Sequence, residues 1–175
     1  KGFTDHRILS NYGVILDDLG KLKEAESLYR KAIKVKPDYS EAHYNLGTLL
    51  KALGKLKDAE ISYLRAIEIN PDYADAHCNL GNILRDTGKL KEAEFSYRKA
   101  IEIKPDFADA YSNLGNILRD NDKLQEAEVS TRKAIEINPD YAEAHYNLGI
   151  ILRDIGKLKD AELSYRKAIE IKPNY

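Results

Sequence analysis

Apolar residues recur three or four positions apart along this chain, in segments that glycine or proline interrupts. In residues 74–107, the apolar positions of the first such segment are Ala76, His77, Leu80, Ile83 and Leu84. This spacing places these side chains on one broad face of a helix. Gly88 ends the segment, because glycine readily takes the left-handed conformation that closes a helix. Asp72 and Asp75 are expected to cap the start of this helix, next to Pro71.

A second helix is predicted in the same stretch, from Lys89 to Ile103, and Pro105 stops it. Its inner side carries Leu90, Ala93, Tyr97, Ala100, Ile101 and Ile103. Helices approach to about 8–10 Å only where the contacting side chains are small, and alanine and glycine supply those contacts here. A hairpin of this size cannot bury its own apolar face, so it must stack on another one.

The hairpin pattern repeats every 34 residues, and the five prolines at positions 37, 71, 105, 139 and 173 mark the period. After an N-terminal extension of residues 1–5, the units have the boundaries 6–39, 40–73, 74–107, 108–141 and 142–175. Self-similarity at a period of about 20–50 residues is typical of stacked repeats. The sequence therefore predicts an all-α solenoid of five stacked helix-turn-helix repeats that form one continuous domain.

The repeated residues resemble the tetratricopeptide repeat. In the second unit they are His43, Leu46, Gly47, Ala59, Tyr63 and Pro71. The resemblance covers residues 6–175, with histidine and leucine at two positions where the family often has tryptophan and tyrosine. The pentatricopeptide repeat, which binds RNA, is the alternative. The pentatricopeptide repeat has a different period from the 34 residues found here, and it has a basic groove, which this sequence lacks.

The resemblance implies helical hairpins that stack into a right-handed superhelix, with the first helices lining a concave groove. Arrays of this family generally hold an extended or helical peptide in that groove. The resemblance therefore implies a non-catalytic protein- or peptide-binding scaffold. A second interpretation makes the chain the substrate-recognition arm of a larger enzyme, such as a glycosyltransferase. A third makes it a structural spacer without a ligand.

Polar residues lie on the side of each first helix opposite its apolar face, and stacking arranges them into ladders. The expected groove residues are Asn11, Asn45, Asn79, Asn113, Asn147, Asn82, Asn116, Tyr44 and Tyr146, with Arg85, Arg119 and Arg153 along a second line. An amide both donates and accepts hydrogen bonds, so a row of asparagines can bracket the backbone of an extended polypeptide. The resemblance adds that O-linked N-acetylglucosamine transferase holds substrate polypeptide with such a ladder. In the other interpretation, each asparagine bonds a neighbouring helix.

The arginines also have two interpretations. Each is followed by an aspartate, as in Arg85-Asp86, so ion pairs between adjacent repeats explain them without a ligand. A guanidinium outside such a pair would instead bind a ligand carboxylate, and we favour the pairing. Some members of the family grip acidic chaperone tails with a groove lysine. That position here holds Ser10, Tyr44, Cys78, Ser112 and Tyr146, which disfavours chaperone-tail binding.

Composition excludes several classes of function. The 28 lysines and arginines balance 29 aspartates and glutamates, so the chain lacks the basic excess of a nucleic-acid-binding domain. No apolar stretch approaches the roughly 20 residues that span a bilayer. The single cysteine cannot form an intrachain disulfide. We expect a cytoplasmic protein that needs no cofactor.

The histidines and the cysteine do not form a catalytic or metal-binding constellation. His43, His77 and His145 occupy one position of separate repeats, about 10 Å or more apart. A zinc ion needs its ligands at about 2 Å, so we expect these histidines to pack in the core. Cys78 is expected to be a mildly exposed thiol without an adjacent base.

Two parts of the array are expected to be irregular. The last unit leaves Leu158, Ala161, Tyr165 and Ile169 uncovered, so either further sequence follows or this end self-associates head to tail. Methionine is absent, and we expect the chain to be part of a longer protein. The fourth unit is predicted to be the weakest, because Asn121-Asp122 replaces the usual glycine closure and Thr131 replaces a core aromatic residue.

Overall fold

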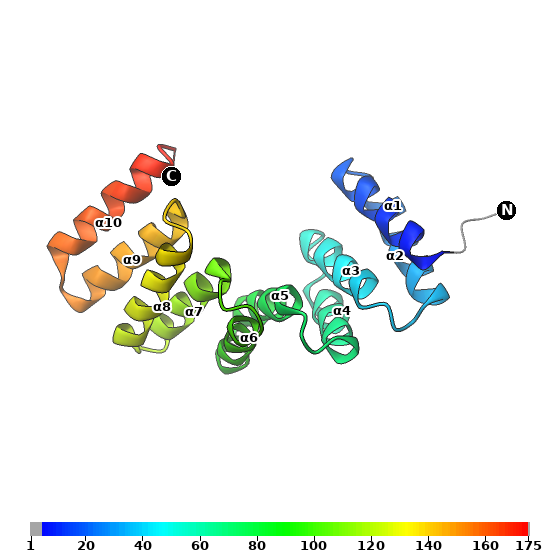
Figure 1. Cartoon of the computed structure of the whole chain (residues 1–175), viewed down its shortest axis with the longest axis horizontal. Helices are drawn as coiled ribbons and strands as arrows, with labels where there is room; N and C mark the ends of the chain where they lie inside the picture. Colours follow the sequence, from blue (N-terminus) through cyan, green and yellow to red (C-terminus); the bar gives the residue numbers. More distant parts are fainter. Residues whose placement is uncertain (1–4, 175) are drawn as a thin grey trace. The chain divides into compact units, whose positions relative to one another are not determined.

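The computed structural model describes residues 5–174, and within them the chain forms ten α-helices and no β-strand (Figure 1). The helices are α1 (His6–Asp18), α2 (Leu22–Val35), α3 (Ser40–Ala52), α4 (Leu56–Ile69), α5 (Ala74–Asp86), α6 (Leu90–Ile103), α7 (Ala108–Asp120), α8 (Leu124–Ile137), α9 (Ala142–Ile155) and α10 (Leu158–Ile171). The predicted all-α repeat fold is therefore confirmed.

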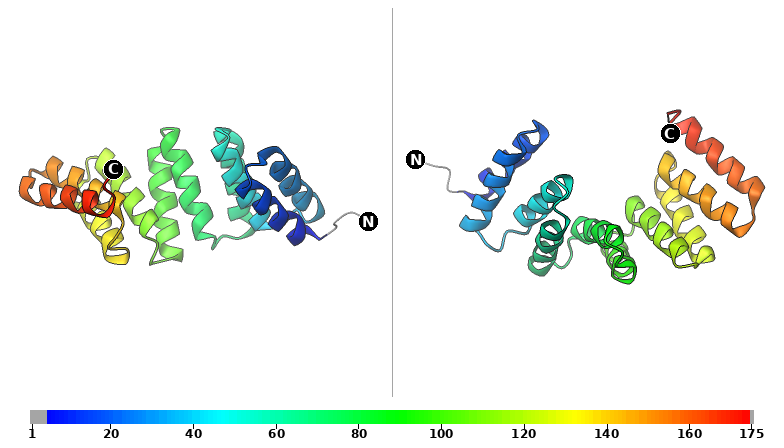
Figure 2. Two further views of the ribbon diagram at one scale, coloured as in Figure 1. Left: turned by 90° about the horizontal axis from the view of Figure 1, so that it is seen from above. Right: turned by 180° about the vertical axis from the view of Figure 1, so that it is seen from behind.

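The chain divides into two compact units, Lys1–Leu84 and Arg85–Tyr175. In the first unit, α1 packs against α2 and α3 against α4, and α2 also contacts α3. In the second unit, α7 packs against α8 and α9 against α10, while α6 contacts α7 and α8 contacts α9 (Figure 2). Each unit is thus built from helical hairpins in which the second helix of one repeat packs on the first helix of the next.

In four repeats, the first helix is followed by a glycine whose backbone has the left-handed conformation. Gly20, Gly54, Gly88 and Gly156 have φ between 71° and 90°, as expected for this closure. In the fourth repeat Asp122 takes the same conformation, with φ 60°. A side chain at this backbone conformation is strained, because its Cβ crowds the carbonyl oxygen. The predicted irregular closure of the fourth repeat is therefore present.

The predicted cap of α5 is wrong. The helix begins at Ala74, and residues 71–72 form a turn ahead of it. The backbone N–H of Asp72 donates to Oδ1 of Asn70 at 3.2 Å. Asp72 therefore belongs to an Asx turn one step before the helix, a local bond that competes with capping. The residue before the helix is Tyr73, and the structure places an aromatic residue there in other repeats too, for example Phe107 before α7.

In the first, second and fifth repeats, a tyrosine on the second helix packs against a glycine on the first helix of the same repeat. Tyr63 is fully buried, and a Cβ atom placed on Gly47 would lie 2.9 Å from its ring. Tyr29 and Gly13 make the same contact, with 2.6 Å between the added Cβ and the ring. Real side chains do not tolerate such distances, so glycine is required for the two helices to approach this closely.

Thr131 stands in the tyrosine position of the fourth repeat. Its side chain is 0% exposed and lies against Gly115, as the tyrosines lie against their glycines. The hydroxyl Oγ1 is buried without a hydrogen-bond partner among the described residues. A buried polar atom without a partner costs stability. The predicted core position of Thr131 is therefore confirmed, and the fourth repeat carries an uncompensated hydroxyl there.

We expect Thr131→Tyr to raise the melting temperature by a few degrees. The substitution restores the ring that fills this position in other repeats and can place its hydroxyl near the repeat surface. Thr131→Val is the matched control, because it removes the buried hydroxyl at nearly constant volume and should give a gain of about 1 kcal/mol. Thermal unfolding followed by circular dichroism measures both. A lower melting temperature for the tyrosine variant would mean that α7 and α8 cannot separate enough to admit the ring.

The uncovered face of α10 is smaller than the sequence predicts. Leu158 and Ile169 are 65% and 56% exposed, as expected. Ala161 is 3% exposed and Tyr165 is half-buried, so the expectation for these two is wrong. Both side chains face inward within their own hairpin, where Tyr165 lies on Gly149.

Candidate functional site

Asparagines on the first helices bond the first helix of the preceding repeat. The Nδ2 group of Asn45 donates to Ser10 Oγ at 3.3 Å, and that of Asn79 donates to the Tyr44 hydroxyl at 3.1 Å. In the second unit, Asn147 Nδ2 donates to Ser112 Oγ at 3.1 Å. Donor and acceptor are 35 residues apart in each case. These bonds match the second interpretation of the asparagines, in which they join neighbouring helices.

The expected ladder residues differ in how much of them reaches solvent. Asn11 is exposed, whereas Asn45, Asn79 and Asn113 are half-buried. Asn147 is only 6% exposed. The ladder face, which we define as the side of the first helices that carries these asparagines, therefore offers less amide surface on α9 than on α1, α3 and α5.

A second set of amides lies three residues further along two of these helices. Asn82 Nδ2 is 3.5 Å from Asn79 Oδ1, a long hydrogen bond within α5. Asn116, at the same position of α7, has its Oδ1 atom buried without a hydrogen-bond partner among the described residues. The Asn116 oxygen is therefore out of reach of a ligand on the surface.

Tyr44 lies at the centre of an aromatic cluster in the first unit. Its ring stacks on that of Tyr73 with 4.8 Å between centroids, and it lies 5.8 Å from the ring of Tyr63. Burial raises the pKa of the Tyr44 hydroxyl above its usual value, so this group stays protonated at neutral pH. In the second unit Tyr146, at the same position, is 41% exposed.

The arginine line forms ion pairs, as favoured from the sequence, but not between repeats. Arg85, Arg119 and Arg153 each pair with the aspartate that follows in the same helix, at 3.3, 2.7 and 2.9 Å. The expectation of pairs between adjacent repeats is therefore wrong for these residues. The neighbouring Asp154 raises the pKa of Arg153. Arg85 also donates through Nη1 to Asn113 Oδ1 at 3.4 Å.

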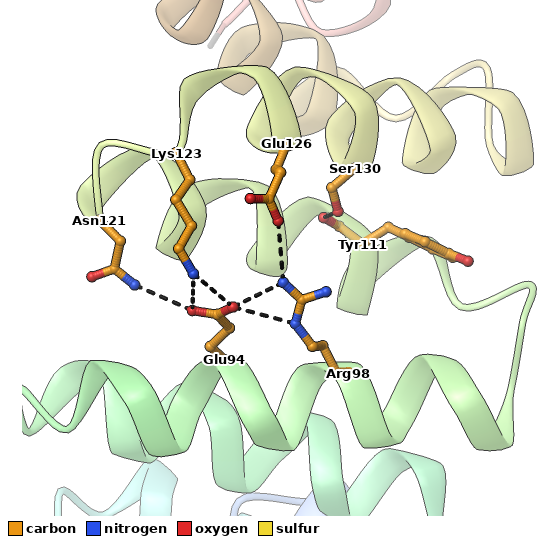
Figure 3. Close-up of polar contacts among 7 residues, drawn as sticks. All are labelled: Glu94, Arg98, Tyr111, Asn121, Lys123, Glu126 and Ser130. Carbon is orange, nitrogen blue, oxygen red and sulfur yellow. Dashed lines mark hydrogen bonds and ion pairs between the residues drawn. The ribbon is translucent and has the colours of Figure 1, made fainter.

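Ion pairs that do join adjacent repeats are formed by lysines and glutamates and not by the predicted arginines. Lys55 pairs with Glu26 at 3.3 Å, and Lys157 pairs with Glu128 at 2.8 Å. Lys123 reaches Glu94 at 3.2 Å, and Asn121 and Arg98 donate to the same carboxylate (Figure 3). The lysine follows the glutamate by 29 residues each time. This constant offset is visible in the sequence and could have identified the pairs.

These carboxylates predict a loss of stability in acid. Hydrogen bonds from Lys157 and Arg132 lower the pKa of Glu128, and those from Arg30 and Lys55 lower the pKa of Glu26. At Glu94, burial raises the pKa, but the hydrogen bonds from Arg98 and Lys123 together outweigh it and lower the pKa. Because the folded-state pKa is the lower one, this stabilisation is complete above the unfolded value of about 4.3. It disappears as the pH falls through the folded-state pKa.

We therefore expect the melting temperature to fall by a few degrees as the pH is lowered from neutral to acid. In the triple variant Glu26→Gln, Glu94→Gln, Glu128→Gln, the deficit relative to the wild type should be largest at neutral pH. It should shrink below about pH 4.3. A deficit that stays constant with pH would show that the carboxylate charges contribute nothing.

A cavity of about 740 Å³ opens between α6, α7 and α8, on the side of α7 away from its ladder face. Its floor is formed by Tyr111, Leu114 and Leu118. Ser130 Oγ donates to the Tyr111 backbone oxygen at 2.8 Å, whereas the serines at this position on other second helices, such as Ser164, bond their own helix (Figure 3). The residue pattern of the repeats does not predict this cavity.

The charged rim of this cavity is internally paired. Arg98 contacts Glu94 and Glu126 at 2.8 and 3.4 Å, and Lys133 contacts Glu136 at 2.7 Å. Smaller cavities of about 450 and 390 Å³ lie at the same position of other repeats, lined by His145 and His43 in place of Tyr111. The hollow is therefore a feature of the repeat that is enlarged in the fourth one.

The histidines of the first helices have a structural contact in common. His43, His77 and His145 each have Nε2 at 2.9 Å from the backbone oxygen of a proline six residues earlier. His6 instead lies edge-on to the ring of Tyr39, with 4.7 Å between centroids. Among residues 5–174, no group of three or more histidines, cysteines and carboxylates could hold a metal ion.

Cys78 is 4% exposed, so the expected mildly exposed thiol is wrong. Ser10 and Ser112 at the same position are also buried. Asparagine from the following repeat bonds this position where the residue is Ser10, Tyr44 or Ser112. In those repeats, the first helix of the following repeat covers a position that looks open when one repeat is considered alone.

The described helices include none that combines the length and apolar character needed to cross a membrane.

Models of known protein families match most of the chain. One, described as TPR repeat, matches residues 13–54, 47–84 and 81–122. Another, described as tetratricopeptide repeat, matches residues 108–141 and 142–175. A search of the curated proteins found no match.

Several solved structures share the fold. A protein called YrrB, described as a TPR protein with an unusual peptide-binding site, is 24% identical with a TM-score of 0.79, covering 98% of this chain and 89% of YrrB. MamA from Desulfovibrio magneticus RS-1 is 20% identical with a TM-score of 0.85, covering 98% and 97%. The thermophilic TPR protein TTC0263 from Thermus thermophilus is 24% identical with a TM-score of 0.74, covering 97% and 92%.

Proposed function

Because this chain belongs to the tetratricopeptide repeat family, we propose that it is a non-catalytic scaffold that binds an extended polypeptide. The ligand lies along the ladder face of one unit, which carries Asn11, Asn45 and Asn79 in the first unit and Asn113 and Asn147 in the second. Membership of the family supports a protein-interaction scaffold in general terms. The peptide-binding site in the printed description of YrrB supports a peptide as the ligand.

The observation that carries the proposal is the repeated bond between amides and the preceding helix. Asn45 and Asn79 each donate that bond through Nδ2. The bond fixes the plane of the side-chain amide. Each Oδ1 oxygen has two lone pairs and can accept from a ligand backbone N–H. A fixed acceptor loses little conformational entropy on binding, so preorganisation favours affinity. The bonds to the preceding helix and the contact with a ligand are therefore compatible.

The second unit would contact the ligand with different groups. Tyr146 is exposed and supplies a ring and a hydroxyl. Arg119 and Arg153 use Nε and Nη2 for their aspartates, and a guanidinium has five N–H donors in all. The remaining donors can bind ligand carbonyl oxygens without breaking the ion pair. The ladder face of the second unit therefore recognises acceptors on a ligand, whereas that of the first unit recognises donors.

Fluorescence anisotropy with labelled peptides tests the proposal. A peptide of about ten residues spans three stacked repeats, since repeats are about 10 Å apart and an extended residue covers about 3.3 Å. Peptides of acidic, basic and neutral composition are screened, and the tightest one is resynthesised with N-methylated backbone amides. We expect N-methylation to weaken binding more than tenfold, and side-chain substitutions to change it less.

The protein side of the test is the variant Asn45→Ala, Asn79→Ala, Asn82→Ala. It should weaken the same peptide more than tenfold while helical content stays unchanged. The matched control is Ser27→Ala with Ile61→Ala, two exposed positions on second helices, which should bind as the wild type does. Unchanged binding by the asparagine variant would restrict these amides to a structural role and contradict the proposal.

A further inference from the structure

An apolar face of α1 is exposed at positions that are buried in all later repeats. Ile8, Tyr12 and Ile15 are 48%, 47% and 55% exposed. The corresponding residues in the later repeats are at most 6% exposed: they are Ala42, Ala76, Ala110, Ala144, Leu46, Leu80, Leu114, Leu148, Leu49, Ile83, Ile117 and Ile151. The α1 face thus resembles the surfaces that pack against the preceding repeat in the rest of the array, but no described helix covers it.

The contacts of later repeats identify what this face is shaped to receive. Ala42 on α3 packs in a cluster with Ala32, and Ile33 packs against that cluster, both from α2. Leu148 on α9 has Ile135 of α8 packed against its cluster. In both units, the cover is therefore the second helix of the preceding repeat.

The matching surface is exposed on α10. Ile169 occupies the position of Ile33 and Ile135, which are half-buried, yet it is 56% exposed. Leu158 on the same helix is 65% exposed, whereas the leucines at its position in earlier repeats, such as Leu124, are half-buried. The α10 surface is thus a second helix without a following first helix among the described residues.

Charges at the two faces also match. The pairs Lys55–Glu26, Lys123–Glu94 and Lys157–Glu128 join consecutive repeats. The same positions are occupied by Lys21 after α1 and Glu162 on α10. The Glu162 side chain is 62% exposed, whereas the glutamates of the three pairs are 13–19% exposed. A lysine and a glutamate are therefore placed to form a further bond of this type between two molecules.

We propose that copies of this chain associate head to tail, with α10 of one copy packed on α1 of the next. In this contact Ile169 lies against Tyr12, and Glu162 pairs with Lys21 of the other copy. The two surfaces are different patches, so the contact is heterologous and continues into longer assemblies. The proposal is independent of the ligand on the ladder face.

The proposed contact between α10 and α1 is expected to be looser than the contacts between internal repeats, because Ile8 is a large residue. Ile8 stands where each later repeat has alanine, and its larger side chain holds the helices further apart. Ile8→Ala should therefore tighten the association about threefold or more, because it restores the internal packing distance. A neutral or weakening effect would contradict a contact that copies the internal one.

Sedimentation velocity with two blocked variants tests the head-to-tail geometry. Ile15→Glu disables the α1 face and Ile169→Glu disables the α10 face; both sites are more than half exposed, so both chains should fold as the wild type does. We expect wild-type oligomers that grow with concentration, and each variant alone to be monomeric. An equal mixture of the two should form a dimer and nothing larger, since one intact face of each kind remains.

Charge reversal at Lys21 and Glu162 supplies a second, independent test of the association. Lys21→Glu or Glu162→Lys should each weaken association about fivefold at low salt, and the combined variant should recover most of the wild-type affinity. A wild-type chain that is monomeric at every concentration would overturn the proposal and assign both faces to other partners. So would a dimeric Ile169→Glu variant, which would indicate contact between two α1 faces.

Discussion

Gly47→Leu should destabilise the first unit by about 3 kcal/mol or more, near the upper end of the cost of overpacking a core. A Cβ atom at this position already lies 2.9 Å from the ring of Tyr63, which is fully buried. The rest of the leucine side chain therefore forces α3 and α4 apart. Chemical denaturation followed by circular dichroism measures the loss.

Gly149→Leu is the matched control in the last repeat. There an added Cβ lies 2.6 Å from the ring of Tyr165, a closer approach than at Gly47. Tyr165 is half-buried, however, so its ring can swing toward solvent. We expect a loss of about half that at Gly47. Equal losses at the two sites would show that backbone crowding, and not the confinement of the tyrosine ring, sets the cost.

Tyr63→Ala should cost about 3–5 kcal/mol, the range for removing a large aromatic side chain from a core. The ring is 0% exposed and fills the space between α3 and α4. Its hydroxyl donates to Thr48 Oγ1 at 3.1 Å, and the ring of Tyr44 lies beside it. The variant therefore creates a cavity directly behind the ladder face.

Tyr63→Phe separates the ring from its hydroxyl. It keeps the packing and removes only the bond to Thr48, so we expect a loss of about 1 kcal/mol. Tyr165→Ala in the last repeat should cost less than Tyr63→Ala, because that side chain is only half-buried. If Tyr63→Ala and Tyr63→Phe lost the same stability, the hydroxyl and not the ring would hold the two helices together.

The fold could be predicted from the sequence because the same residue pattern recurs every 34 residues. Any one hairpin gives an ambiguous pattern, but the same leucine, glycine, alanine and proline positions recur in phase along the chain. The start of α5 was misplaced because Asn70 and Pro71 favour a turn that the capping pattern of Asp72 and Asp75 conceals. Local bonds of this kind depend on one side-chain oxygen and leave little trace in hydrophobic periodicity.

The candidate site was harder to predict because stacking changes what a single repeat exposes. Cys78 and Asn147 lie on the polar side of their helices, yet the structure buries both. Each arginine was expected to reach the next repeat, but the aspartate one residue away is closer and competes for it. Positions relative to a neighbouring repeat can be predicted only with the offset between repeats, as the lysine–glutamate pairs at 29 residues illustrate.

The fixed offsets between bonded residues have a consequence for the length of such a chain. Lys123 meets Glu94, and Lys157 meets Glu128, with the same spacing. Deleting residues 108–141 as a block would bring Lys157 into the place of Lys123, opposite Glu94. Duplicating the block would add a bond of the same kind. Whole-unit gain or loss thus preserves the register of the ion pairs, whereas a deletion of one residue within a helix would break it.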